Sequence, residues 1–413
     1  MKCETCGIEN PSLKRCSACK AAYYCSKECQ NKAWPTHKHE CKKATTPVPE
    51  ANTAPHNRID DFELLDIIGR GNFTDIFKAI EKSTKKEFAI KVAEKAKLIK
   101  LHKEDDLFVE KHCLNKLKGV NNVVQLHETF KDEFKLYLVM ELLEGKELWE
   151  VAKTFGFQNR KLAYYYFNRI LKVVREVHGR GIAHRDLKPE NIMVAGPEIK
   201  LFDFGTAKDI QDNVASKGNS STGRKYFEHF VGTPNYMAPE CIHNKDSGYS
   251  SDVYALGVLF YFLLVGYPAF IGGSEYLIFK DVLEGPEPRF YDFLFTGEDI
   301  SIIQRMIDHS LEKRPTIDQL VDAFAKYDEF DYQTIIDEPS SIDKFFMDAT
   351  QDFIKGNKEA DRERILTYID GKLLEVEDKF TETEHTHVAR RLKLLSLQLM
   401  DHYGLQEFEF KDI

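Results

Sequence analysis

The chain has 413 residues, of which 42% are hydrophobic and 30% are charged. This composition is typical of a globular protein with more than one domain, and the formal net charge of −9 argues against a general nucleic-acid-binding surface. The N-terminal residues contain no apolar run, so we expect no secretory signal. The charge-free run at 253–274 is long enough to span a membrane, but Gly266, Pro268 and the glycines at 272–273 interrupt it. We therefore interpret it as a buried helix.

Seven of the nine cysteines lie within the first 41 residues. Without a secretory signal, so dense a thiol cluster indicates metal binding, with a redox or disulfide cluster as the alternative. Together with one histidine, the cysteines form four close pairs: Cys3-x-x-Cys6, Cys16-x-x-Cys19, Cys25-x-x-x-Cys29 and His37-x-x-x-Cys41. Eight ligands suffice for two tetrahedral zinc sites. Because so short a segment has little core, we expect the metal to supply most of its folding free energy.

This pattern, with the stretch "AAYYCSKECQNKAW", resembles the MYND-type zinc finger. The resemblance implies cross-braced ligand sets, namely Cys3, Cys6, Cys25 and Cys29 for one zinc and Cys16, Cys19, His37 and Cys41 for the other. His39 is a competing ligand, but its spacing fits the family poorly. The family also implies binding of peptides, often proline-containing ones, and a finger that is only a folded cap is the alternative. The proline-containing segment 42–60 is predicted to be a linker.

From Asp61 the pattern changes to strand, glycine loop, strand, turn and strand. Gly69 and Gly71 permit close approach of the backbone to phosphates, because no Cβ intervenes. Thr74 stands at the third glycine position, so the loop motif alone is weak. Lys91 follows on an apolar strand, where it is either a solvated charge or a phosphate ligand. The later motifs "HRDLKPEN" at 184–191 and "DFG" at 203–205 favour the phosphate ligand.

Over 61–330 these motifs resemble the eukaryotic protein kinase family, and "HRDLKPEN" with "GTPNYMAPE" resembles its serine/threonine kinases. The resemblance implies an α+β, bilobal fold that uses ATP and Mg²⁺, with a small lobe at 61–143 and a large lobe at 144–330. Phosphoryl transfer needs positioning and charge neutralisation rather than covalent help. Lys91, oriented by Glu110, would then hold the α- and β-phosphates.

The same resemblance gives roles to the other motif residues. Asp203 and Asn191 would bind magnesium, Asp186 would accept the proton of the substrate hydroxyl, and Lys188 would neutralise the γ-phosphate. Asp252 resembles the aspartate that braces the catalytic loop. Glu240 is expected to pair with Arg314 as a structural ion pair.

We also expect a nucleotide-binding set around the glycine loop and the base. Met140 would lie behind the adenine, the backbone of Glu141 and Leu143 would bond to it, and Glu147 would reach the ribose. The full expected set is Ile68, Gly69, Arg70, Gly71, Asn72, Phe73, Thr74, Ile76, Ala89, Lys91, Met140, Glu141, Leu143, Glu147, Glu190, Asn191, Met193 and Asp203.

Several stretches, especially "GRGNFTDI", "DFGTAK" and "GGSEYLIFKDV", resemble the 3-phosphoinositide-dependent protein kinases, the master kinases of the AGC group. That family phosphorylates activation loops of other AGC kinases and recruits them through a small-lobe pocket. Lysines beside apolar residues suit an anionic hydrophobic motif, and a groove with solvated lysines is the alternative. The expected pocket comprises Lys95, Leu98, Ile99, Lys111, Thr129, Lys131 and Leu136.

The sequence also departs from that family. We recognise no pleckstrin-homology domain after the kinase, so the finger is the candidate localising module. His229 occupies the position of the activation-loop phosphoserine, so Arg185 lacks its usual partner. Either Glu228 supplies a weaker anion, the loop is ordered without one, or the phosphate lies elsewhere, the candidates being Ser220, Ser221, Thr222 and Tyr226. We expect a constitutively competent loop, controlled by docking.

The aromatic segment "YDEFDY" at 327–332 resembles the hydrophobic motif, with Asp331 in place of the phosphate. The alternative is an aromatic segment that closes the catalytic core. From Ile342 the apolar spacing predicts two or three amphipathic helices, with a stop at Gly404. The sequence leaves open whether these helices pack on the kinase or mediate self-association. The ending "LQEFEFKDI" is another candidate docking peptide.

In sum, the sequence predicts a MYND-type finger at 1–41, a linker at 42–60, a kinase domain at 61–330 and a helical extension at 331–413. The expected activity is that of an ATP- and Mg²⁺-dependent serine/threonine kinase that carries two Zn²⁺ ions and acts on proteins, in the cytoplasm or the nucleus. The alternative is a scaffold, tethered by the finger, that transfers little phosphate. We expect no nucleic-acid partner and no transmembrane segment.

Overall fold

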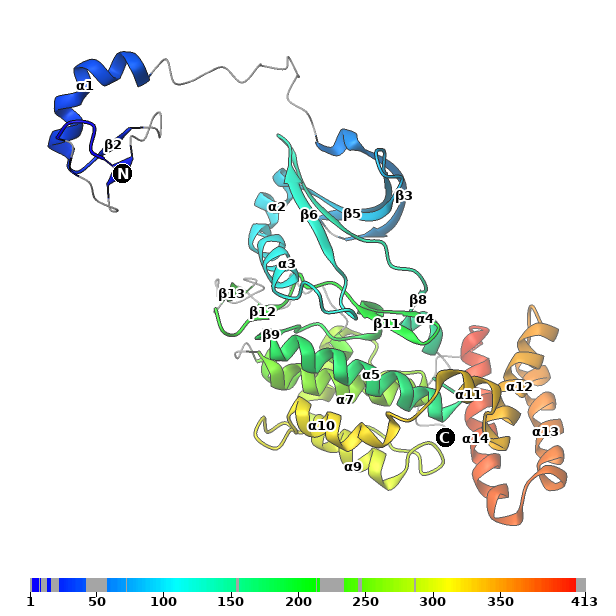
Figure 1. Ribbon diagram of the computed structural model, residues 1–413. Helices are drawn as coiled ribbons and strands as arrows, with labels where there is room; N and C mark the ends of the chain where they lie inside the picture. Colours follow the sequence, from blue (N-terminus) through cyan, green and yellow to red (C-terminus); the bar gives the residue numbers. More distant parts are fainter. Residues whose placement is uncertain are drawn as a thin grey trace. The chain divides into compact units, whose positions relative to one another are not determined.

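The computed structural model describes residues 2–6, 8, 13–15, 22–41, 58–71, 73–153, 156–212, 214–215, 234–243, 247–285 and 287–405. The chain divides into two compact units, Met1–Asp60 and Asp61–Ile413. Figure 1 shows both units, with labels on the helices and strands where there is room.

In the described residues of the first unit, most of the regular structure belongs to one helix. β1 (Lys14–Arg15) pairs antiparallel with β2 (Tyr23–Tyr24), and α1 (Lys27–Cys41) follows. Its described hydrophobic core consists of the buried residues Cys3, Ala22 and Tyr24, with Leu13, Cys29 and Ala33 packed against them. A small described core agrees with the expectation that bound metal supplies most of the folding free energy of this segment.

The small lobe of the second unit is built on a five-stranded antiparallel sheet with strand order β3-β4-β5-β7-β6. The strands are β3 (Phe62–Arg70), β4 (Thr74–Glu81), β5 (Glu87–Glu94), β6 (Leu126–Lys131) and β7 (Lys135–Glu141). The short helix η1 (Arg58–Asp61) precedes the sheet, and α2 (Lys95–Leu101) and α3 (Glu104–Lys116) lie beside it (Figure 1). The strand, loop and strand order predicted from Asp61 is therefore confirmed.

The large lobe is mainly helical. Its α-helices are α4 (Leu148–Ala152), α5 (Arg160–Gly179), α6 (Pro239–Ile242), α7 (Tyr249–Val265), α8 (Glu275–Glu284), α9 (Gly297–Met306) and α10 (Ile317–Phe324). Short 3₁₀ helices are η2 (Pro189–Asn191), η3 (Pro234–Tyr236) and η4 (Ala325–Tyr327). Two small sheets complete the lobe, formed by β8 (Lys146–Glu147), β10 (Ile192–Ala195) and β11 (Glu198–Leu201), and by β9 (Ile182–Ala183), β12 (Lys208–Asp209) and β13 (Val214–Ala215).

Helix α7 is the charge-poor segment that the sequence places in the interior. Every residue from Ser251 to Val265 is buried, and Gly266 ends the helix in a left-handed conformation with φ +90°. A helix that is apolar on all sides is stable only when other elements surround it. Among the described residues, the chain has no helix long and apolar enough to cross a membrane.

The C-terminal region forms α11 (Tyr332–Asp337), α12 (Ser341–Gly356), α13 (Arg362–Lys379) and α14 (Glu382–His402). The last three helices share a hydrophobic core of their own, centred on Phe346, Phe353, Leu392 and Leu399. Gly404 has φ +66°, so the predicted helix stop there is confirmed.

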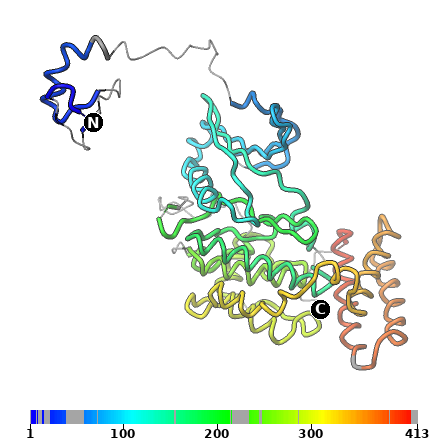
Figure 2. The backbone as a smooth tube through the Cα atoms, in the orientation of Figure 1, coloured from blue at the N-terminus to red at the C-terminus, as the bar shows by residue number. Residues whose placement is uncertain are grey.

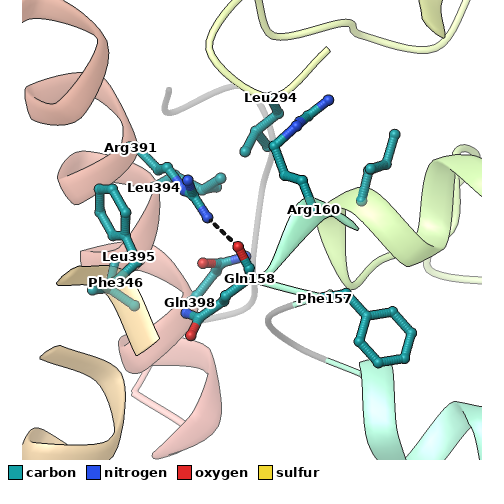
Figure 3. A pocket seen from close by; sticks show the side chains of 10 residues that line it. Phe157, Gln158, Arg160, Leu294, Phe346, Arg391, Leu394, Leu395 and Gln398 are labelled. Atoms are coloured by element: carbon teal, nitrogen blue, oxygen red, sulfur yellow. Dashed lines mark hydrogen bonds between the residues drawn. The ribbon is translucent and has the colours of Figure 1, made fainter. Parts of the chain in front are cut away.

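This three-helix region packs on the large lobe, as the tubes of Figure 2 show. Figure 3 shows the contact, in which Arg391 of α14 points toward Gln158, just before α5. The Arg391 guanidinium donates to the Gln158 carbonyl at 2.8 Å and pairs with Asp343 at 3.0 Å. Gln398 donates to the carbonyl of Val265 at 3.1 Å. Of the two alternatives left open by the sequence, packing of these helices on the rest of the second unit is thus observed within one chain.

The aromatic segment 327–332 also packs on the large lobe. The ring of Tyr327 stacks on Tyr164 of α5 with centroids 4.6 Å apart, and Tyr332 lies against Tyr165 at 5.5 Å. Asp331 caps α11 through the Thr334 N–H. The segment therefore closes the catalytic core and does not occupy the small-lobe pocket of its own chain, as the simpler of the two interpretations predicted.

Candidate active site

The loop that carries the motif at 184–191 is held in place by Asp252 of α7. Asp252 is fully buried and accepts the backbone N–H groups of His184 at 2.9 Å and Arg185 at 2.7 Å, while His178 Nε2 lies 2.8 Å from the same carboxylate. Burial alone would raise the pKa of Asp252, but these hydrogen bonds lower it below its usual value. The bracing role expected for Asp252 therefore has a direct geometric basis.

The loop brings three of the predicted catalytic side chains together. Lys188 Nζ donates to Asp186 Oδ2 at 2.8 Å, and Asn191 Nδ2 donates to the same oxygen at 3.0 Å and to the Asp186 carbonyl at 2.8 Å. Burial raises the pKa of Asp186, and the positive charge of Lys188 opposes that rise. A carboxylate held by a cation and an amide, with its pKa raised, is suited to accept a proton in a reaction.

The other three predicted catalytic residues meet between sheet and loop. Lys91 Nζ donates to both oxygens of Glu110, at 2.7 and 2.8 Å, and lies 3.5 Å from Asp203 Oδ1. Burial would lower the pKa of Lys91, but the two carboxylates raise it above its usual value. The Lys91 charge in turn holds the pKa of Asp203 below its usual value. The ammonium and the Asp203 carboxylate are therefore both charged at neutral pH.

Two residues of this site have unusual backbone conformations. Arg185 has φ +69° and Asp203 has φ +61°, both in the left-handed region that non-glycine residues seldom adopt. Such strain costs on the order of 1–3 kcal/mol per residue and persists only where surrounding contacts enforce it. Here the Asp252 hydrogen bond to Arg185 and the ion pair of Asp203 with Lys91 supply those contacts.

The strand register places the residues expected around the base. Ala89 pairs with Met140 across β5 and β7, Ile76 pairs with Lys91, and Met193 pairs with Glu147. The Gly71 N–H donates to the Thr74 carbonyl at 2.7 Å, so the glycine loop turns tightly. Asn72 lies outside the described residues.

Asp203 and Asn191 fit a magnesium ion chemically. Mg²⁺ prefers hard oxygen ligands, which a carboxylate and a carboxamide oxygen provide. The carbonyl of Asn191 also accepts the Phe202 N–H at 3.0 Å, which ties this residue to the strand that precedes Asp203.

The first unit contains a cluster that fits zinc. The four sulfur atoms of Cys3, Cys6, Cys25 and Cys29 all lie within 4.8 Å of one another. Cys25 Sγ is 3.5 Å from Cys6 Sγ and 3.4 Å from Cys29 Sγ. Four thiolates about 2.3 Å from one ion would lie at nearly this spacing, so the first expected ligand set is brought together. Of the second set, Cys16, Cys19 and the Cys41 side chain lie outside the described residues, and His37 packs against Tyr24 and Trp34.

The residues expected to form the docking pocket lie on adjoining elements of the small lobe. Lys95, Leu98 and Ile99 are on α2, Lys111 is on α3, Thr129 and Lys131 are on β6, and Leu136 is on β7. Leu98 is 1% exposed, whereas Ile99 is 60% exposed. Lys95 donates to the backbone carbonyls of Asp132 and Glu133. Glu228, His229 and the alternative phosphorylation positions Ser220, Ser221, Thr222 and Tyr226 lie outside the described residues.

Sequence reasoning missed one ionic cluster near the site. Asp209, six residues after Asp203, contacts His112 and Lys116 of α3. No motif marks these residues, and 97 positions separate Asp209 from His112. By contrast, the predicted pair of Glu240 and Arg314 is present at 2.7 and 2.9 Å and is buried.

Comparison with known proteins agrees with this geometry. The family described as "Protein kinase domain" matches residues 62–324, and the one described as "MYND finger" matches residues 3–41. The serine/threonine-protein kinase ksg1 of Schizosaccharomyces pombe is 36% identical over 283 residues, which are 67% of this chain and 48% of the relative. PKH1 of Saccharomyces cerevisiae is 32% identical over 264 residues, covering 62% and 33%. The 3-phosphoinositide-dependent protein kinase 1 of Homo sapiens is 34% identical over 252 residues, covering 58% and 44%.

The chain thus spans about half or less of the length of these curated relatives. The kinase match nevertheless covers more than half of the chain, and it contains all six predicted catalytic residues. The chain belongs to the protein kinase family and carries a MYND finger before its kinase domain.

Proposed function

We propose that the chain is an ATP- and Mg²⁺-dependent serine/threonine protein kinase of the AGC master-kinase type, within the non-specific serine/threonine protein kinase class. The observation that carries this proposal is the pair of linked clusters, Lys91 with Glu110 and Asp203, and Asp186 with Lys188 and Asn191. The names of the relatives, which are serine/threonine kinases and a 3-phosphoinositide-dependent protein kinase, support the subtype.

In this proposal each side chain has a defined task. Bound ATP with Mg²⁺ would supply the γ-phosphoryl group and cationic charge that offsets the negative charge of the phosphates. Lys91, fixed by Glu110, orients the α- and β-phosphates, and Asp203 and Asn191 hold the metal. Asp186 holds the incoming hydroxyl and takes up its proton, while Lys188 offsets the charge on the transferred group.

The finer parts of the proposal concern recruitment. The substrates would be activation loops of other AGC kinases, bound through the small-lobe set that includes the exposed Ile99, Lys111 and Lys131. The finger, with two zinc ions on the two ligand sets, would bind proline-containing peptides and localise the chain in the cytoplasm or the nucleus. The short distances among the sulfur atoms of Cys3, Cys6, Cys25 and Cys29 support a zinc ion at the first ligand set.

A phosphorylation assay tests the catalytic proposal. Wild-type protein and the Asp186→Asn variant are incubated with MgATP and peptides taken from activation loops of AGC kinases. We expect Asp186→Asn to lower kcat about 10²- to 10⁴-fold, because a positioned proton acceptor contributes about that much. The control is Asp348→Asn, an exposed aspartate within α12, which should leave kcat unchanged. Equal, negligible transfer by wild type and Asp186→Asn would instead leave only a scaffold.

A further inference from the structure

Asp209 makes a set of contacts that the catalytic roles above do not explain. It lies in β12, which pairs with β9 and β13, and its side chain is completely buried. Asp209 Oδ1 accepts the backbone N–H groups of Gln211 and Asp212, both at 3.0 Å. Asp209 Oδ2 lies 2.8 Å from His112 Nε2 and 2.7 Å from Lys116 Nζ. Both carboxylate oxygens therefore accept hydrogen bonds, Oδ1 from the backbone just after β12 and Oδ2 from side chains of α3.

The two side-chain partners come from one face of α3. His112 and Lys116 are four residues apart, so they stand one above the other on the helix surface. Glu110, which holds Lys91, belongs to the same helix. The end of α3 has a further attachment, since Arg180 donates to the carbonyl of Lys116 at 2.9 Å. α3 is thus held at Glu110 by Lys91 and again at Asp209, through His112 about half a turn later and Lys116 about 1.7 turns later.

The charges of this cluster suit a permanent ionic contact. Burial would raise the pKa of Asp209, but the hydrogen bonds from Lys116, from the Asp212 backbone and from His112 lower it well below its usual value. An ionised carboxylate can only accept hydrogen bonds. The Nε2 atom of His112 therefore carries a hydrogen and donates a hydrogen bond to Asp209. The Asp212 carboxylate also lies 3.6 Å from the Lys116 ammonium. The hydrogen bond to Asp209 and the charges of Asp209 and Asp212 raise the pKa of Lys116.

A metal site is a poor alternative for these residues. His112, Asp209 and Asp212 lie close enough together to ligate one cation. However, the Lys116 ammonium lies 2.7 Å from the same Asp209 oxygen and already supplies the compensating positive charge. A bound cation would have to displace it or suffer its repulsion.

We propose that Asp209 is a positioning residue that anchors α3 to the activation segment and so keeps Glu110 and Lys91 in their working arrangement. The inference deepens the proposed kinase function and rests on it for its catalytic part. Asp209 is part of the chain rather than a modification, so the anchor is present whatever the phosphorylation state of the segment that follows. It gives a physical basis for a kinase whose activity does not require an activation-loop phosphate.

The test compares Asp209→Asn with Asp348→Asn, the same change at an exposed carboxylate of α12. Three quantities are measured on the full chain: kcat, the KM for peptide, and the hydrogen exchange of α3 amides. For Asp209→Asn we expect kcat to fall at least tenfold, the KM for peptide to change less than about twofold, and α3 exchange to accelerate at least tenfold. Asp348→Asn should change each quantity less than about twofold. Unchanged kcat and unchanged α3 exchange in Asp209→Asn would overturn the inference.

Variants of Lys116 exclude a general folding defect. Lys116→Met should reproduce the loss of kcat, Lys116→Arg should restore most of it, and the double variant with Asp209→Asn should be no worse than either single variant. Additive losses, or no rescue by arginine, would contradict the anchor. Treatment of the wild-type chain with phosphatase should leave its kcat unchanged. A large fall in kcat after this treatment would count against the anchor.

The exchange measurement separates the two proposals. If the wild-type chain transfers no phosphate, the proposed function fails. Faster α3 exchange in the Asp209→Asn variant of that same inactive chain would still support the anchor, and unchanged exchange would overturn it.

Discussion

The two units of the chain are stabilised in different ways. In the first unit the described core has three buried residues, and four cysteine sulfur atoms lie together beside it. In the second unit one cluster of buried apolar residues runs from the small lobe through the large lobe to Leu394 of α14. Apolar burial stabilises a large unit, but a segment of about forty residues needs a cross-link or a metal. We therefore expect different perturbations to unfold the two units.

The largest expected effect is zinc removal. Structural zinc supplies about 10–16 kcal/mol of apparent binding free energy in small fingers, so a zinc chelator should unfold the first unit alone. The chain has two tryptophans, Trp34 in α1 and Trp149 in α4, which report on separate units. With Trp149→Phe, chelation should change the fluorescence. With Trp34→Phe it should not, and a change there would show that the second unit also depends on the metal.

The next effect concerns the buried ion pair of the large lobe. Arg314→Met leaves the Glu240 carboxylate buried without its bidentate partner, with Ser251 as its remaining hydrogen bond. Breaking a buried pair in this way costs about 3–5 kcal/mol. Urea unfolding followed by Trp149 should show that loss, while the zinc-dependent signal of Trp34 should stay unchanged. The control Lys313→Met alters a lysine side chain that is 72% exposed and should cost less than about 1 kcal/mol.

A smaller effect, with a defined pH dependence, is expected at Asp209. Its pKa in the folded chain lies below the ordinary value of 3.8, so it contributes stability that is fully present above pH 3.8 and is lost as the pH falls through the folded pKa. Asp209→Asn should therefore cost about 1–3 kcal/mol at pH 7, because it leaves buried donors poorly satisfied. Unfolding followed by Trp149 should show this difference from wild type shrinking below about pH 4. A difference that grew towards acid pH would contradict the sign of the shift.

The smallest effect is expected at the surface of the helical region. Leu374 of α13 is 73% exposed, so Leu374→Ser removes little buried area. We expect a change in unfolding free energy within about 0.5 kcal/mol, measured by urea unfolding with Leu392→Ala as the contrasting buried change. Leu392 is completely buried, and its truncation should cost about 2–5 kcal/mol. A large loss at Leu374 would reveal a partner for that face of α13.

Local sequence predicted those parts of the molecule whose chemistry is carried by neighbouring residues. The motif at 184–191 contains Asp186, Lys188 and Asn191 within six positions, and they meet in the structure as expected. The charge-free run predicted the burial of α7, because charged side chains are almost never fully buried without partners. The apolar spacing after Ile342 predicted the helices α12 to α14.

Local sequence patterns did not predict the contacts between segments that lie far apart in the sequence. Gln158 and Arg391 meet although 233 positions separate them, and neither belongs to a recognisable motif. The same holds for Asp209, His112 and Lys116, which are charged or polar residues that become partners only in the fold, where Asp209 is buried and the two α3 side chains are partly exposed. The choice between packing and self-association for the helical region also depended on such contacts.

The contact of α14 with the end of α7 bears on how the protein can be shortened. Gln398 satisfies the last carbonyl of the central helix, and Asp401 accepts the Tyr267 hydroxyl at 2.7 Å. A fragment that ends at residue 324, where the kinase match ends, would lose both hydrogen bonds. It would also expose to water the side chains of Leu264 and Leu294, which lie beside α14. Such a fragment should aggregate on expression, whereas one running from 58 to 405 should not. We therefore expect the smallest piece that folds to be larger than the region that carries the chemistry.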